Sequence, residues 1–103
     1  MVAKLIALYK QPADAQAFDD KYFNEHIPLA QKMPGLQLIE ISKVSGAPMG
    51  EPAYYLMAEL YFDNIEAVKA GLSSPEGKAA GKNIMSFAGD LVTMMYAEVA
   101  DKS

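Results

Sequence analysis

The chain has 103 residues, a length that fits one domain over residues 1–103 with a single modest hydrophobic core. Hydrophobic residues make up 51% of the chain and charged residues 21%, which excludes an intrinsically disordered protein. The net charge is −4 and the basic residues are scattered. Because nucleic acids and anionic membrane surfaces require clusters of lysine and arginine, neither partner is expected.

Segments that direct a protein to or across a membrane are not expected either. No apolar run approaches the ~20 residues that span a bilayer. Residues 1–5 (Met-Val-Ala-Lys-Leu) resemble the start of a strand rather than a signal peptide. There is no cysteine, so disulfides and thiolate chemistry are excluded. We therefore expect a cytoplasmic protein.

The first half of the chain predicts a strand, a long helix and a second strand. Residues 2–10 alternate like a strand, and Asp14 is a candidate N-cap for the helix that follows. A helix is expected over residues 15–33, where apolar side chains recur at spacings of three and four. Pro28 lies within it and lacks an amide donor, so we expect a kink or a break at this residue. Residues 36–45 predict the second strand.

The second half continues with a turn-rich loop over residues 46–52 and a third strand over residues 54–62. The second and third strands are expected to form a hairpin with a long connection. Asp63 and Glu66 have the spacing of a capping box, with Asp63 at the N-cap. This pair predicts a helix that runs to about residue 72.

A further helix and a last strand complete the chain. Ser74 is a candidate N-cap with Pro75 at the first helical position, and this helix should reach about residue 88, although Gly77 and Gly81 weaken it. Residues 91–99 predict the last strand. The order β-α-β-β-α-β is that of the ferredoxin-like α+β fold, with one four-stranded antiparallel sheet.

Both faces of this sheet are predicted to be apolar. In the third strand, Leu56 and Leu60 share one face while Met57 and Tyr61 lie on the other, interrupted only by Glu59. We expect Glu59 to be either solvated at an edge of the sheet or buried with a raised pKa. An antiparallel sheet with a wet face normally alternates cleanly between apolar and polar residues.

A second copy of the chain is therefore expected to cover the outer face of the sheet. Two such sheets would pack face to face in a homodimer with the helices outside. The alternative is a monomer that exposes some apolar surface, as small proteins do. Packing in the sheet or at the interface is also the expectation for the tyrosines placed in strands, which are Tyr55, Tyr61 and Tyr96.

The pattern Tyr-x-x-x-His-x-Pro-Leu over residues 22–29, followed by Pro34-Gly35, resembles the EthD family, named for a protein linked to ethyl tert-butyl ether degradation. The resemblance implies a dimeric α/β barrel. Relatives with this fold include small monooxygenases, dehydratases, isomerases and haem-handling proteins. The fold therefore leaves the function of this chain open.

Three residues are the candidates for catalysis: His26, Tyr22 and Asp90. His26 is the only histidine, and histidine transfers protons near neutral pH. The alternative role for His26 is structural, as a buried, hydrogen-bonded group that fixes the helix at Pro28. Tyr22 could assist from the same helix face, and Asp90 could orient His26. Core packing is the more common role of a tyrosine at such a position, and an aspartate after glycine is more often a turn residue.

An apolar pocket between sheet and helices is the expected binding site for a hydrophobic or aromatic small molecule. Its candidate ligand-binding residues are Tyr9, Phe18, Leu29 and Phe87. No zinc or dinucleotide motif is present, so we expect no metal and no cofactor. The leading hypothesis is a cofactor-free enzyme for proton transfer, dehydration or oxygenation. The alternatives are a ligand carrier or accessory protein of a degradation pathway, and a purely structural dimer.

Overall fold

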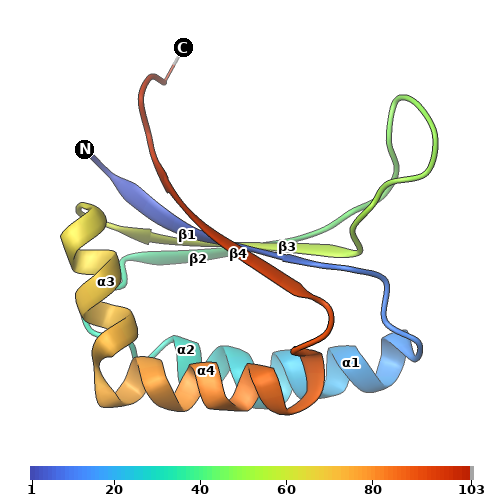
Figure 1. Cartoon of the computed structure of the whole chain (residues 1–103), viewed down its shortest axis with the longest axis horizontal. Coiled ribbons are helices and arrows are strands. Elements are labelled where there is room, and N and C mark those ends of the chain that lie inside the picture. Colours follow the sequence, from blue (N-terminus) through green and yellow to red (C-terminus); the bar gives the residue numbers. More distant parts are fainter. Residues whose placement is uncertain (103) are drawn as a thin grey trace.

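The computed structural model describes residues 1–102 and shows the predicted β-α-β-β-α-β order (Figure 1). The strands are β1 (Ala3–Tyr9), β2 (Leu38–Lys43), β3 (Leu56–Phe62) and β4 (Val92–Glu98). They form one antiparallel sheet in the order β2-β3-β1-β4, so the ferredoxin-like α+β prediction is confirmed. The expected β2–β3 hairpin is also confirmed.

The helical segments are α1 (Ala15–Lys21), a π-helical turn η1 (Tyr22–His26), α2 (Ile27–Ala30), α3 (Ile65–Ser73) and α4 (Pro75–Ala88). Figure 1 shows α1, α2 and α4 on one side of the sheet, whereas no helix covers the opposite side. Among residues 1–102, no helix has the length and apolar character needed to cross a membrane.

The core lies between the sheet and the helices. Buried and half-buried residues alternate along β1, and Leu5, Ala7 and Tyr9 belong to the buried set. The same alternation runs along β3, and the antiparallel register brings Leu5 opposite Leu60. The two central strands therefore present one continuous apolar surface to the helices.

The helical run from α1 to α2 is continuous, but the spacing of its backbone hydrogen bonds changes in η1, just before Pro28. The amide of Ile27 donates to the carbonyl of Tyr22, five residues back, so η1 is a wider turn than an α-helix. This change of turn is the disturbance predicted at Pro28. The helix ends at Ala30 rather than at the expected Met33, because the amide of Met33 bonds to Ala30 in a tighter three-residue turn.

The caps of the last two helices correct one prediction and confirm another. Asn64, not Asp63, caps α3, since its side chain accepts a 2.8 Å bond from the amide of Ala67. Asp63 instead accepts a hydrogen bond from the side-chain amide of Gln37. Ser74 caps α4 as predicted, through a 3.0 Å bond from the amide of Gly77.

The sheet face that points away from the helices carries apolar side chains beside charged ones, and the chain itself leaves it uncovered. Ile6 of β1 is half-buried, and its partner across the β1–β4 pair, Met95, is 42% exposed. Lys4 and Glu59 form a 2.6 Å ion pair between β1 and β3. Because β3 is an inner strand, the expected position of Glu59 at a sheet edge is wrong, and its carboxylate binds Lys4.

Gly77 should be essential to the contact between α3 and α4. A Cβ atom at this position would lie 2.1 Å from the carbonyl oxygen of Gly71, which is backbone and cannot swing aside. We expect Gly77→Ala to lower the free energy of unfolding by about 1–3 kcal/mol in urea denaturation. Gly46→Ala is the control, because no atom lies within 4 Å of the added methyl. Equal stability of the two variants would contradict this packing.

Candidate functional site

An inner cavity of about 80 Å³ lies between the sheet and the helices. Its walls are mostly apolar and come from β1, β3, β4 and the helical segments. The side chains with polar groups on its wall are those of Tyr9, Tyr22 and His26. The structure thus brings two of the predicted catalytic residues and one predicted ligand-binding residue to one cavity.

The wide turn η1 positions two of these residues. Tyr22 begins the turn and His26 ends it, and their rings are 5.4 Å apart. The ring of Tyr22 is also 5.2 Å from that of Tyr9 on β1, in an edge-on arrangement. Turns of this kind occur often at functional sites, because they re-aim side chains within a helix.

His26 is half-buried, and its Nδ1 atom is buried without a hydrogen-bond partner among residues 1–102. Burial lowers the pKa of His26 below its usual value, and the side chain of Asn83 and the backbone of Ala80 oppose this effect. The Oδ1 atom of Asn83 is also buried without a hydrogen-bond partner in this part of the chain. His26 is therefore neutral at pH 7, with one ring nitrogen able to accept a proton.

Tyr9 and Tyr22 differ from His26 in that their side chains act as hydrogen-bond donors at neutral pH. Burial raises the pKa of Tyr9 to about 12, and a side-chain hydrogen bond with Tyr22 acts in the other direction. Burial also raises the pKa of Tyr22, and the neighbouring Tyr9 raises it further. Both hydroxyl groups therefore keep their protons at neutral pH. They can donate hydrogen bonds but cannot serve as bases.

An outer cleft of about 490 Å³ contains the other predicted residues. Phe87 and Asp90 line this cleft and not the inner cavity, so the structure does not bring Asp90 to His26. Phe18 also lines it, with its ring 5.6 Å from Tyr9 and 5.8 Å from Phe87, and so lies between the two spaces. Leu29 lines neither space and packs against the core.

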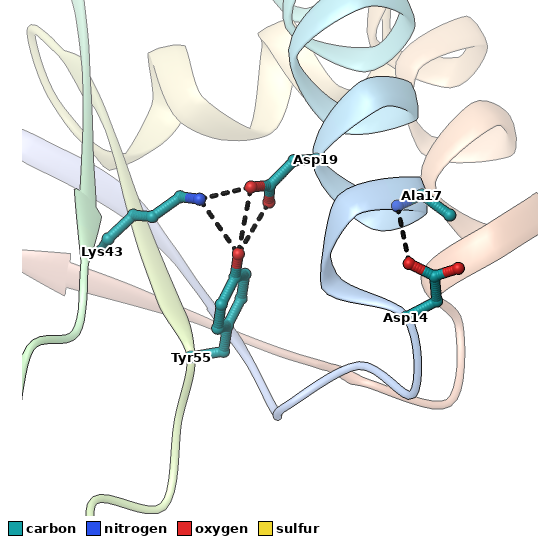
Figure 2. Close-up of polar contacts among 5 residues, drawn as sticks. All are labelled: Asp14, Ala17, Asp19, Lys43 and Tyr55. Atoms are coloured by element: carbon teal, nitrogen blue, oxygen red, sulfur yellow. Dashed lines mark hydrogen bonds and ion pairs between the residues drawn. The ribbon is translucent and has the colours of Figure 1, made fainter.

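Figure 2 shows a polar cluster that the sequence did not predict. The hydroxyl of Tyr55 donates to Asp19 at 2.9 Å, and Lys43 binds both of these residues, with a 3.0 Å bond to Tyr55. Tyr55 precedes β3, so its predicted place in a strand is wrong. The cluster joins α1 to β2. Separately, the predicted capping of α1 by Asp14 is confirmed by a 3.1 Å bond from the amide of Ala17.

The role of this cluster is to hold elements together rather than to form a reaction centre. Asp19, through its hydrogen bond, is the main cause of the raised pKa of Lys43, which stays charged at neutral pH. Within residues 1–102, no group of three or more acidic or histidine side chains is placed to hold a metal ion. The inner cavity is therefore the better candidate site.

The lowered pKa of His26 predicts a pH dependence of stability. An unfolded chain takes up this proton near pH 6.5, but the folded chain does so only at lower pH. The melting temperature should therefore fall as the pH decreases from 7.5 to 5.5. The His26→Gln variant cannot titrate there and should show a smaller decrease. A folded pKa of 6.5 or above, from NMR titration of the single histidine, would contradict the burial of a neutral ring.

Comparison with known proteins identifies the family. The sequence model of the EthD domain matches residues 10–90. An uncharacterized 11.0 kDa protein from the thcB-thcC intergenic region of Rhodococcus erythropolis is 32% identical over 95 residues, which cover 92% of each chain. The crystal structure of an EthD family protein from Bacillus halodurans is 51% identical, with a TM-score of 0.91, over 95% of this chain and 98% of that chain.

A more distant similarity supports the fold alone. The crystal structure of a dimeric protein of unknown function with a ferredoxin-like fold, from Bacteroides fragilis, is 21% identical to this chain. Its TM-score is 0.63, over 94% of this chain and 95% of that chain. The matched domain and the two closer relatives lead to one conclusion: the chain belongs to the EthD family.

Proposed function

We propose that the protein binds a small, mainly apolar molecule in the inner cavity and that His26 exchanges a proton with it. The observation that carries this proposal is the Nδ1 atom of His26, which is buried and has no partner among residues 1–102. Buried polar atoms are almost always hydrogen-bonded. Since His26 lies on the cavity wall, a ligand with a hydrogen-bonding group is a suitable partner for this nitrogen.

The side chains around the cavity support acid–base chemistry. Neutral His26 would accept a proton from the ligand, while the protonated hydroxyls of Tyr9 and Tyr22 would donate hydrogen bonds to the negative charge that develops. His26 would then return the proton. A carrier is the alternative, in which His26 only forms a hydrogen bond to the ligand.

The size of the cavity narrows the class of ligand. A cavity of about 150 Å³ accommodates benzene, whereas the inner cavity measures about 80 Å³. A short aliphatic molecule with one polar group therefore fits better than the aromatic molecule that the sequence also allowed.

We also propose that two copies associate through the outer sheet face. Met95 and the half-buried Ile6 give this face an apolar patch beside the Lys4–Glu59 ion pair. The β2–β3 loop, the start of β1 and the described residues after β4 project on the same side, where they would flank a partner (Figure 1). The dimeric state of the Bacteroides fragilis protein, which shares the fold, is consistent with this arrangement.

The ligand proposal predicts a molecule that co-purifies with the protein. We expect mass spectrometry of solvent extracts to find a short polar–apolar molecule in the wild type and in Asp90→Asn, since Asp90 lines only the outer cleft. His26→Gln should retain about tenfold less, because a buried hydrogen bond to the ligand is lost. Equal recovery from His26→Gln, or an empty wild-type extract, would contradict the proposal.

The same sample distinguishes an enzyme from a carrier. After incubation in D₂O, an acid–base enzyme should exchange a carbon-bound hydrogen of the ligand for deuterium, and a carrier should return it unchanged. General acid–base catalysis typically contributes about 10²–10⁴-fold to a rate. We therefore expect His26→Gln to slow the exchange by at least about 10²-fold, and an unchanged exchange rate would remove His26 as the base.

The dimer proposal predicts that a charge in the centre of the outer face separates the subunits. Met95→Lys should convert a dimer into a monomer in light scattering, since two lysines would face each other across an apolar contact. Met85→Lys is the matched control, because Met85 is 60% exposed on α4, on the helix side of the sheet. A wild-type monomer, or a Met95→Lys dimer of unchanged stability, would contradict the proposed interface.

A further inference from the structure

Gly81 lies in the interior of α4 without a packing reason to be glycine. It shares the inward face of this helix with the buried residues Gly77 and Ile84, four positions before it and three after it. Glycine destabilises a helix interior relative to alanine, because it loses more backbone freedom on folding. A glycine at such a position therefore needs a structural or functional explanation.

Close packing explains Gly77 but not Gly81. A Cβ atom on Gly77 would collide with the backbone of α3, whereas a Cβ atom on Gly81 would meet nothing within 4 Å outside its own helix. The conformation of Gly81 is also compatible with any residue, since it lies within α4 and has no positive φ. The space beside Gly81 is therefore open, and this space belongs to the inner cavity.

Some of the residues that line the cavity are partly exposed to solvent. Met94 of β4 lines the cavity and is 44% exposed, and Gly81 is partly exposed. Most of the other lining residues, including Ala80 and Ile84 next to Gly81 in α4, are buried. The partly exposed Gly81 and the flexible side chain of Met94 thus mark a route from solvent to His26.

We propose that Gly81 determines the size of ligand that the inner cavity admits, with its missing side chain keeping space open for the ligand. This inference rests on the proposed function, because it assigns the open space to ligand rather than to a packing defect. A methyl group is comparable to a water molecule, whose share of liquid volume is ~30 Å³. Gly81→Ala would therefore take up a substantial part of the 80 Å³ cavity.

Xenon is a suitable probe, since it enters small apolar cavities without requiring a polar partner. Labelling the methionine methyl groups with ¹³C places two reporters, Met33 and Met94, in the cavity wall. Met49 and Met1 are 88% and 70% exposed and serve as references that should not respond. In the wild type, freed of small molecules by unfolding and refolding, xenon pressure should shift the Met33 and Met94 signals along a saturation curve.

Gly81→Ala should raise the dissociation constant for xenon about tenfold or more, as expected for one added carbon in a tight pocket. It should also raise the melting temperature by about 4–8 °C, because alanine favours the helix. Ala79→Gly is the matched control, since Ala79 is an exposed position of the same helix. This variant should lower the melting temperature and leave xenon binding unchanged.

The outcomes separate the two proposals. If the wild-type Met33 and Met94 signals do not move, the cavity is closed and the proposed function fails together with the role of Gly81. If they move equally in the wild type and in Gly81→Ala, only the role of Gly81 is overturned. A lower melting temperature for Gly81→Ala would also overturn it, because the space would then not be open.

Discussion

The missing amide hydrogen of Pro28 is the constraint on which the candidate site depends. In an α-helix that amide would donate to the carbonyl of Asn24, and proline cannot form this bond. The chain responds with the wide turn η1, closed by the bond from Ile27 to Tyr22. Tyr22 and His26, at the two ends of this turn, both reach the space above β1. A regular helix would orient these two side chains differently.

A second constraint is that the helices of the chain cover only one face of the sheet. The helices bury the face of β1 that carries Leu5 and Tyr9, and they enclose the inner cavity against it. The opposite face keeps apolar side chains such as Met95 exposed in the single chain. The candidate site and the proposed dimer interface thus lie on opposite faces of one four-stranded layer.

Local patterns predicted the elements of the fold well, because alternation, apolar spacing and capping residues act over a few neighbouring positions. They failed where two neighbours compete or where distant segments meet. Asp63 and Asn64 can both cap a helix, and the capping-box spacing of Glu66 favoured the wrong one. The contact of Asp19 with Tyr55 joins residues 36 positions apart, and no local signal indicates it.

The same reasoning explains the mixed result for the site. The helical spacing of Tyr22 and His26 was visible in the sequence. The place of Asp90 in the outer cleft, beyond the ring of Phe18, arises from contacts between distant segments. Gly77 and Gly81 are alike as helix-weakening residues in the sequence. Only the packing in the structure shows that Gly77 is in close contact with α3 and that Gly81 lies beside open space in the cavity.

The most direct test of the central claim is a ¹⁵N NMR measurement of the single histidine. The spectrum of the protein as isolated is compared with that of protein freed of small molecules by unfolding and refolding. We predict that the Nδ1 signal of His26 changes between the two samples, because a ligand occupies its hydrogen-bonding position only in the first. An identical Nδ1 signal in both samples, typical of a nitrogen bonded within the protein, would contradict the account.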